Sequence, residues 1–234
     1  MSVSSNHWDM NKAPTWVIHK TWAGGSAARV LFFTRAQGLV WARCQGGWSP
    51  KKQALIQAYH PLWVDFTQRQ GWYYVQHLEL AGMAFDYTAP NLLTALYVNE
   101  LLYHGLRQQD PHPELYDAYV TTLQNLSLAT SQPQLEQVLR RFEWALLSSI
   151  GYAISLTHDG QTYQPIVADY YYVFKAGLGL ILAQEGLLGA DILAMANDDL
   201  SDPKVLKTAK HMMRSALHHA LGGKRIKSRD FYRA

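Results

Sequence analysis

Residues 28–43 read ARVLFFTRAQGLVWAR, and this stretch decides the fold of the N-terminal part of the chain. Two short apolar runs, Ala28–Thr34 and Leu39–Arg43, flank the segment Ala36-Gln37-Gly38. Short runs rich in aromatic and β-branched residues, joined by a turn that contains glycine, are typical of a β-hairpin. The stretch therefore predicts two consecutive antiparallel strands.

Three further strand-like runs surround this hairpin. They are Trp16–Lys20, Leu62–Thr67 and Trp72–Leu80. Turn signals at Gly24-Gly25 and Arg69-Gln70-Gly71 separate the runs, and a short helix fits between Lys51 and Ala58. Five strands with a helix after the third predict an N-terminal five-stranded OB-fold β-barrel over residues 1–85, although an SH3-like barrel remains possible.

After Pro90 the apolar period changes from two residues to about 3.6, which indicates helices. The first helix extends to Leu106, and two more begin at Pro113 and Pro133, where proline suits the first helical turn. A hairpin-like pair, Tyr170–Lys175 and Leu178–Leu182, then precedes a short helix at Ala190–Ala196. These patterns predict an α+β protein whose residues 86–234 form a mainly helical domain.

The last helix has the clearest boundaries. Ser201 or Asp202 can cap its N-terminus, Pro203 occupies its first turn, and Gly222-Gly223 ends it. Cations share one stripe of this helix and continue into the segment beyond the glycines. The stripe holds Lys204, Lys207, His211, Arg214 and His218, and the segment adds Lys224, Arg225, Lys227, Arg229 and Arg233.

The net charge of +3 conceals a strong segregation along the chain. Residues 1–85 carry eight Lys/Arg against three Asp/Glu, residues 86–203 carry four against fourteen, and residues 204–234 carry nine against one. Two basic ends around an acidic middle favour a polyanionic ligand bound at the ends. The alternative is that the basic C-terminal segment docks on the acidic block and stabilises the fold.

Several classes of protein are excluded by composition and motifs. We expect a cytosolic globular protein, because 48% of the residues are hydrophobic and neither a membrane-spanning stretch nor a signal peptide is recognisable. The single Cys44 can form neither an internal disulfide nor a structural zinc site. G-x-S-x-G, P-loop, H-E-x-x-H and complete G-x-G-x-x-G motifs are missing, so we expect no catalytic residue, metal or cofactor.

The predicted barrel offers cations and aromatic side chains for a nucleic acid. The candidate phosphate ligands are Arg29, Arg35, Arg43, Lys51 and Lys52. Trp41 or Trp48 could stack on an unpaired base, which is how OB-folds bind single strands. Trp48 is favoured because it lies in a predicted loop beside Gly47, where burial is harder to achieve. The alternative for each tryptophan is packing in the barrel core.

Three segments, in the same order and spacing, resemble the RecO family of bacterial DNA repair proteins. The segments are YVNELL at 97–102, LRRFE at 139–143 with Gly151-Tyr152, and LGGK at 221–224 with KSR at 227–229. The resemblance implies an OB-fold followed by a helical domain. It also implies a recombination mediator that binds single- and double-stranded DNA, anneals complementary strands, and works with RecR to load RecA onto strands coated by single-stranded-DNA-binding protein.

The resemblance suggests a partner site and a location as well. A mediator of this kind would be associated with the nucleoid, with RecF as a possible further partner. Its helical domain would capture the acidic C-terminal tail of single-stranded-DNA-binding protein, at Leu139, Arg140, Leu146 and Leu147 in this chain. A cation beside apolar side chains suits a terminal carboxylate. The alternative for Arg140 is an intramolecular pair with Glu136.

The chain departs from the family pattern at two places. Paired C-x-x-C motifs, which some members carry in the helical domain, are missing, so zinc should be absent. The basic residues after the third strand lie further along, at Lys51 and Lys52, so the DNA surface could be redistributed. The competing hypothesis is a protein-interaction adaptor in which the barrel binds a partner protein without a direct DNA role.

Overall fold

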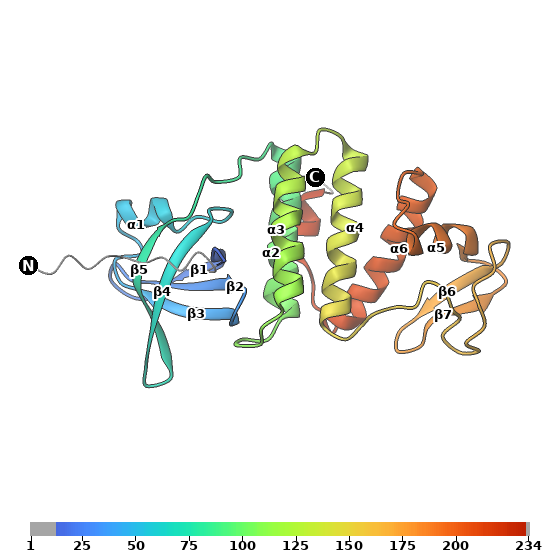
Figure 1. Cartoon of the computed structure of the whole chain (residues 1–234), viewed down its shortest axis with the longest axis horizontal. Helices are drawn as coiled ribbons and strands as arrows, with labels where there is room; N and C mark the ends of the chain where they lie inside the picture. The colour runs from blue at the N-terminus through green and yellow to red at the C-terminus, as the bar shows by residue number, and fades with distance from the viewer. Residues whose placement is uncertain (1–12, 233–234) are drawn as a thin grey trace, which may run out of the picture. The chain divides into compact units, whose positions relative to one another are not determined.

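The computed structural model describes residues 13–232, and these residues form two compact units (Figure 1). The sheet unit contains the described residues up to 84 together with residues 107–116. The helical unit contains residues 85–106 and the described residues from 117 onward.

The sheet unit contains five strands and one short helix. They are β1 (Trp16–Trp22), β2 (Ala28–Thr34), β3 (Gly38–Cys44), α1 (Pro50–Leu55), β4 (Leu62–Arg69) and β5 (Trp72–Leu80). The strand order is β1-β2-β3-β5-β4, with β3 parallel to β5 and the other neighbours antiparallel. The five strands predicted from the sequence are confirmed, and so is a helix between the third and the fourth.

The sheet curves in the manner of an OB-fold but does not close completely. Among the described residues, β4 approaches β1 through one bridge, in which Thr15 and Leu62 exchange backbone hydrogen bonds of 2.7 and 3.0 Å. A partly open five-stranded barrel is the usual form of this fold. The prediction of an OB-like sheet followed by a helical region is therefore confirmed.

Alternate residues of the strands form the core of the sheet unit. Val30, Phe32 and Ala42 point inward with Val17 and Val75, as the period of two requires. On the other face, the ring of Phe33 packs 5.5 Å from that of Tyr116, and Gln109 donates a backbone hydrogen bond to Leu39. Residues 107–116 thus cover one end of the outer face, and the end near Arg29 stays exposed.

The helical unit combines long helices with a small sheet. Its elements are α2 (Ala89–Gly105), α3 (Pro113–Leu128, of which residues 113–116 belong to the sheet unit), α4 (Gln132–Ser149), β6 (Tyr171–Lys175), β7 (Gly179–Ala183), β8 (Leu187–Leu188), α5 (Gly189–Ala196), α6 (Pro203–Ala220) and the 3-10 helix η1 (Lys227–Tyr232). Helix α4 packs against both α2 and α6, and α6 also contacts α5 and β6. The predicted helices and the β6–β7 hairpin are confirmed, whereas β8 and η1 were not predicted.

Helix α6 has the boundaries that its sequence predicts. The Asp202 carboxylate accepts a hydrogen bond of 2.8 Å from the backbone N–H of Lys204, which caps the helix. Gly222 and Gly223 have φ angles of +62° and +74°, a conformation that glycine adopts without strain, and the helix ends there. Within residues 13–232, no helix is both long and apolar enough to span a membrane.

Candidate nucleic-acid interface

The exposed end of the outer sheet face combines cations with large aromatic rings. The strand register places Arg29 of β2 opposite Arg43 of β3, and Arg43 beside Tyr74 of β5. The Arg29 guanidinium lies 4.6 Å from the ring centroid of Trp41 and 5.9 Å from that of Trp72. Three adjacent strands thus hold one arginine against two indole rings, and we call Arg29, Trp41, Arg43 and Trp72 the aromatic face.

The aromatic face is open to a ligand. The Trp72 side chain is 61% exposed, Arg29 and Arg43 are exposed, and Trp41 is half-buried. Exposed indole rings can stack on unpaired bases, while neighbouring guanidinium groups neutralise phosphates. Trp72 was not predicted as a site residue, although its position directly after the hairpin glycine Gly71 is a signal for an exposed ring.

Trp48 occupies a different environment from the one its sequence suggests. Its ring is half-buried against the core of the sheet unit, and its backbone N–H donates to the Ser26 carbonyl at 2.9 Å. The preceding Gly47 makes this possible, because a side chain there would collide with Ala28 of β2. Trp48 is therefore more buried than its loop position suggested, and its role in stacking on a base stays a prediction.

The other candidate cations of the sheet unit lie apart from the aromatic face. Arg35 follows β2 at the end opposite Arg29 and lines a cavity of about 400 Å³ together with Asp65. Lys51 and Lys52 belong to α1, where Lys51 is exposed and the Lys52 ammonium donates to the Gln45 carbonyl at 2.8 Å. The structure thus brings Arg29 and Arg43 together but not the remaining three.

Helix α6 displays the predicted basic stripe on the helical unit. Lys204, Lys207 and Arg214 are all exposed. On another side of the helix, the Lys210 ammonium pairs with Glu136 of α4 at 3.1 Å. The stripe is therefore available to a polyanion, whereas Lys210 is used within the unit.

The segment after α6 is partly docked on α2. The Glu100 carboxylate accepts hydrogen bonds from the backbone N–H groups of Lys227 and Ser228 at 2.7 and 2.8 Å. Arg229 donates to the Tyr97 hydroxyl at 2.8 Å, and Arg225 pairs with Asp230. Lys224 and the Lys227 side chain are exposed, and Arg233 lies outside the described residues. The alternative that the basic C-terminal segment docks on the acidic block therefore fits Arg229, whereas the side chain of Lys224 is exposed.

Arg140 belongs to a buried polar cluster between α2 and α4. Its guanidinium lies 2.6 Å from the Glu143 carboxylate, which also accepts a hydrogen bond of 2.7 Å from the Tyr97 hydroxyl. Arg140 is 7% exposed and Glu143 1%. Burial raises the pKa of Glu143, and the Arg140 charge opposes that shift. The suggested Arg140–Glu136 pair is not formed, because Glu136 faces Lys210 instead.

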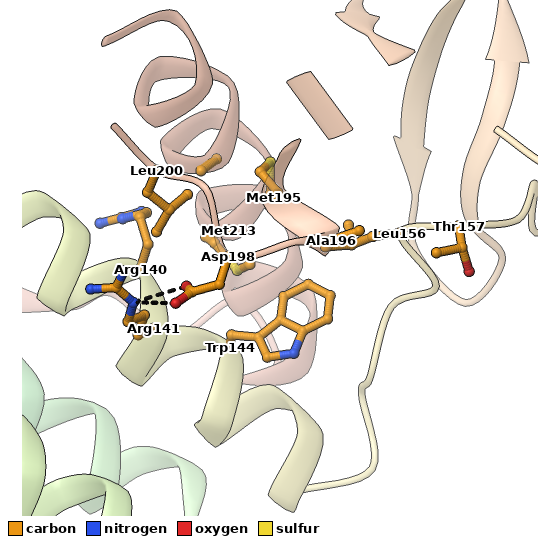
Figure 2. A pocket seen from close by; sticks show the side chains of 11 residues that line it. Arg140, Arg141, Trp144, Leu156, Thr157, Met195, Ala196, Asp198, Leu200 and Met213 are labelled. Carbon is orange, nitrogen blue, oxygen red and sulfur yellow. Dashed lines mark hydrogen bonds and ion pairs between the residues drawn. The ribbon is translucent and has the colours of Figure 1, made fainter. Parts of the chain in front are cut away.

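A cavity of about 510 Å³ lies beside Arg140 and is shown in Figure 2. Trp144, Leu156 and Met195 provide much of its apolar lining, and Arg141 pairs at its rim with Asp198 at 2.8 Å. Of the predicted tail-binding residues, only Arg140 lines this cavity. Leu139 lines a smaller neighbouring one, and Leu146 and Leu147 are buried in the core.

Comparisons with known proteins agree with the resemblance. The family model described as "Recombination protein O C terminal" matches residues 87–230. A DNA repair protein RecO from Legionella pneumophila (strain Lens) is 46% identical over 218 residues, which cover 93% of this chain and 95% of the relative. A DNA repair protein RecO from Pseudomonas putida (strain W619) is 39% identical over 227 residues, covering 94% and 96%. The chain belongs to the RecO family.

Membership of the RecO family supports a role in DNA repair and recombination. It also points to DNA and the recombination machinery as partners, and the RecO relatives are named as repair proteins rather than as enzymes. The aromatic face and the α6 stripe are the exposed cationic surfaces that the structure offers for such a role. Of the two, only the aromatic face combines cations with indole rings, the exposed Trp72 and the half-buried Trp41.

Proposed function

We propose that this protein is a recombination mediator whose aromatic face binds single-stranded DNA. The observation that carries the proposal is the Arg29 guanidinium within 4.6 Å of the Trp41 ring centroid and 5.9 Å of that of Trp72, at the exposed end of an OB-like sheet. Stacking on an aromatic side chain contributes about 1–3 kcal/mol per base. Duplex DNA has no unpaired bases to offer, so it binds through its phosphates alone.

The experiment compares single-stranded and duplex oligonucleotides across a range of salt concentrations. Replacing Trp41 and Trp72 by alanine should weaken single-strand binding by roughly tenfold or more, and duplex binding much less. Replacing Arg29 by glutamine should lower the log–log salt slope by about 0.7 on single strands. Equal losses on both ligands would contradict the stacking role.

Trp22 provides a matched control for the two tryptophans. It is 68% exposed but pairs in register with Ala28, an inward-facing residue, so it lies off the aromatic face. Trp22→Ala should leave both affinities unchanged. If Trp22→Ala lost as much affinity for single strands as the Trp41 and Trp72 variants, exposed aromatic rings in general would bind DNA, and the aromatic face would have no specific role.

The finer activities of the mediator rest on family membership. We propose that the protein anneals complementary strands and, with RecR, helps load RecA onto strands coated by single-stranded-DNA-binding protein, with RecF as a possible participant. Annealing requires no catalytic residue, because base pairing supplies the free energy and cations reduce the repulsion between strands. Such a protein would act in the bacterial cytoplasm, at the nucleoid. Annealing of coated strands, with and without RecR, tests this proposal.

We further propose that the cavity in Figure 2 captures the C-terminal tail of single-stranded-DNA-binding protein. Its apolar lining suits a hydrophobic side chain, and the exposed Arg141 at its rim would exchange its partner Asp198 for a carboxylate of the peptide, whereas Arg140 stays paired with Glu143. Trp144→Ala should weaken binding of the tail peptide by about tenfold or more, because buried aromatic anchors dominate such interfaces. Leu178→Ala, on the exposed β6–β7 turn, is the control. Unchanged peptide affinity in the Trp144 variant would exclude this cavity.

The competing hypothesis of a protein-interaction adaptor predicts a different dependence of oligonucleotide affinity on salt concentration. An adaptor without a direct DNA role would bind oligonucleotides weakly and without a specific loss in the Trp41 and Trp72 variants. DNA binding through several phosphates falls steeply as salt increases. A salt titration of the full chain therefore separates the two hypotheses before any substitution is made.

A further inference from the structure

A second cationic cavity lies on the helical unit, between α6 and the turn that follows β6. It has a volume of about 650 Å³, and we call it the histidine groove. Helix α6 contributes His211, Arg214, His218 and His219 to one wall, and Phe174 lies on the other. The four α6 residues recur at i, i+3, i+7 and i+8, so one continuous face of the helix is turned to the groove.

The charge of the histidine groove is unusual for this unit. Among the described residues that line it, none is acidic. The cavity of Figure 2 contains Asp198, and the smaller one beside Leu139 contains Glu136 and Glu143. In a part of the chain dominated by Asp and Glu, a groove lined only by basic, small and apolar side chains points to an anionic ligand.

The basic stripe of α6 continues beyond one end of the groove. Lys207 lies one helical turn before the lining residue His211 and is exposed. A further cation therefore lies outside the groove on the side of the helix that carries Arg214. An extended row of this kind suits a polymer of phosphates better than a single small anion.

The dipole of α6 favours the binding of phosphates at the end of the groove that lies further from the C-terminus of the helix. The carboxyl end of a helix carries a partial negative charge that acts within its last turn, where His218 and His219 lie. His211 and Arg214 lie further from that end, so phosphates are expected to contact them most closely. Arginine offers a fork of N–H donors, and histidine donates a hydrogen bond either as a neutral ring or as a cation.

We propose that the histidine groove is a second strand site, which holds the phosphate backbone of one DNA strand while the aromatic face holds another. This proposal rests on the proposed DNA-binding function and adds to it a stoichiometry of two strands per chain. Simultaneous binding of two strands is what annealing requires, because two polyanions must be neutralised together before they can pair.

The test counts strands bound to the full chain. Native mass spectrometry with two non-complementary oligonucleotides of different mass should show one chain carrying both strands. The His211→Gln/Arg214→Gln double variant should keep the first strand and lose about tenfold or more in affinity for the second, because two charge-assisted hydrogen bonds are removed. His211→Arg should strengthen binding of the second strand.

Lys210→Gln is the matched control on the same helix. It removes one cation whose partner is Glu136 and which lies outside the groove, so second-strand binding should not change. The substituted side chains of the double variant are exposed, and equal melting temperatures would show that its fold is intact. A double variant that still binds two strands with wild-type affinity, or a loss in Lys210→Gln as large as in the double variant, would overturn the proposal.

The outcomes separate this proposal from the proposed function. If the Trp41 and Trp72 variants bind strands normally but the double variant loses one, the groove is a strand site and the aromatic face is not. If the aromatic-face variants lose a strand and the double variant loses none, the proposed function stands and the histidine groove is excluded.

Discussion

Replacing Glu143 by glutamine should destabilise the helical unit more than replacing its partner Arg140. The two side chains form a buried pair at 2.6 Å, and the Tyr97 hydroxyl donates to the same carboxylate. Glutamine retains the shape of Glu143 and an oxygen for Tyr97, so the variant isolates the loss of charge. Breaking a buried pair at one partner typically costs about 3–5 kcal/mol, because the other charge is left uncompensated.

The asymmetry between the partners follows from their protonation chemistry. Arginine keeps its proton in proteins, so Glu143→Gln leaves a charged guanidinium in the interior that cannot neutralise itself. We expect a loss of about 3 kcal/mol, the lower end of the range for a broken pair, since the amide oxygen still accepts a hydrogen bond. In Arg140→Met, Glu143 can instead take up a proton, and the loss of stability should be smaller.

The loss of stability in the Arg140→Met variant should also depend on pH and should be smaller at acidic pH. Burial already raises the pKa of Glu143, and removing Arg140 removes the charge that opposes this shift. A carboxyl whose folded-state pKa is above its unfolded value stabilises the protein below the unfolded pKa and loses that contribution as the pH rises through the folded value. Relative to wild type, the variant should therefore be less destabilised at acidic pH than at pH 8.

Urea denaturation followed by circular dichroism at 222 nm measures these differences, because the long helices all lie mainly in the helical unit. The double variant Arg140→Met/Glu143→Gln should recover stability to within about 1 kcal/mol of the milder single variant, since it buries no isolated charge. If Glu143→Gln loses less than about 1 kcal/mol, or if Arg140→Met is the more damaging at pH 6, the pair does not act as a buried ion pair.

Three shorter predictions concern other parts of the chain. Asp159→Ala should speed amide hydrogen exchange at Leu182 of β7, because the N–H of Leu182 donates to this carboxylate at 2.7 Å, as do two N–H groups of the neighbouring turn; unchanged exchange would contradict its role. Burial alone would raise the pKa of Glu100, but the hydrogen bonds from Ser228 and Lys227, together with His104, outweigh that effect and hold the pKa below its usual value. The docking it provides should therefore weaken as the pH falls, and Glu100→Ala should expose η1 to proteolysis at all pH values. Gly38→Ala should lower the melting temperature, because φ is +66° there and a methyl group would collide with the Asp110 carbonyl; a wild-type melting curve would refute that contact.

The sequence predicted most elements because their signals are local. Apolar alternation and glycine turns located the five strands, and proline with capping residues located the long helices. Strand β8 has two residues, too few for a period, and η1 depends on Glu100, which lies over a hundred residues away. Elements that depend on distant contacts carry no periodic signal that a single sequence could reveal.

The candidate site was predicted less completely, for the same reason. Arg29 and Trp41 were singled out separately, but the contact of Arg29 with both Trp41 and Trp72 depends on the register of three strands and on the parallel pairing of β3 with β5. The partial burial of Trp48 was not predicted, because Gly47, which has the character of a loop residue, permits close approach to β2. Residue type therefore indicated the chemistry of the site, and topology decided which residues share it.

The cations of the basic C-terminal segment and of α6 differ in their contacts with the rest of the helical unit. A charge count treats its cations as equivalent, yet Arg229 bonds to Tyr97 and so adjoins the buried pair of Arg140 and Glu143. Neutralising Arg229 would disturb the fold and DNA binding together, so a slower annealing rate in such a variant could not be assigned to either. The exposed stripe of α6 has no such role in the core. The cations of α6 are therefore the ones whose removal isolates an electrostatic contribution of the helical unit to DNA binding.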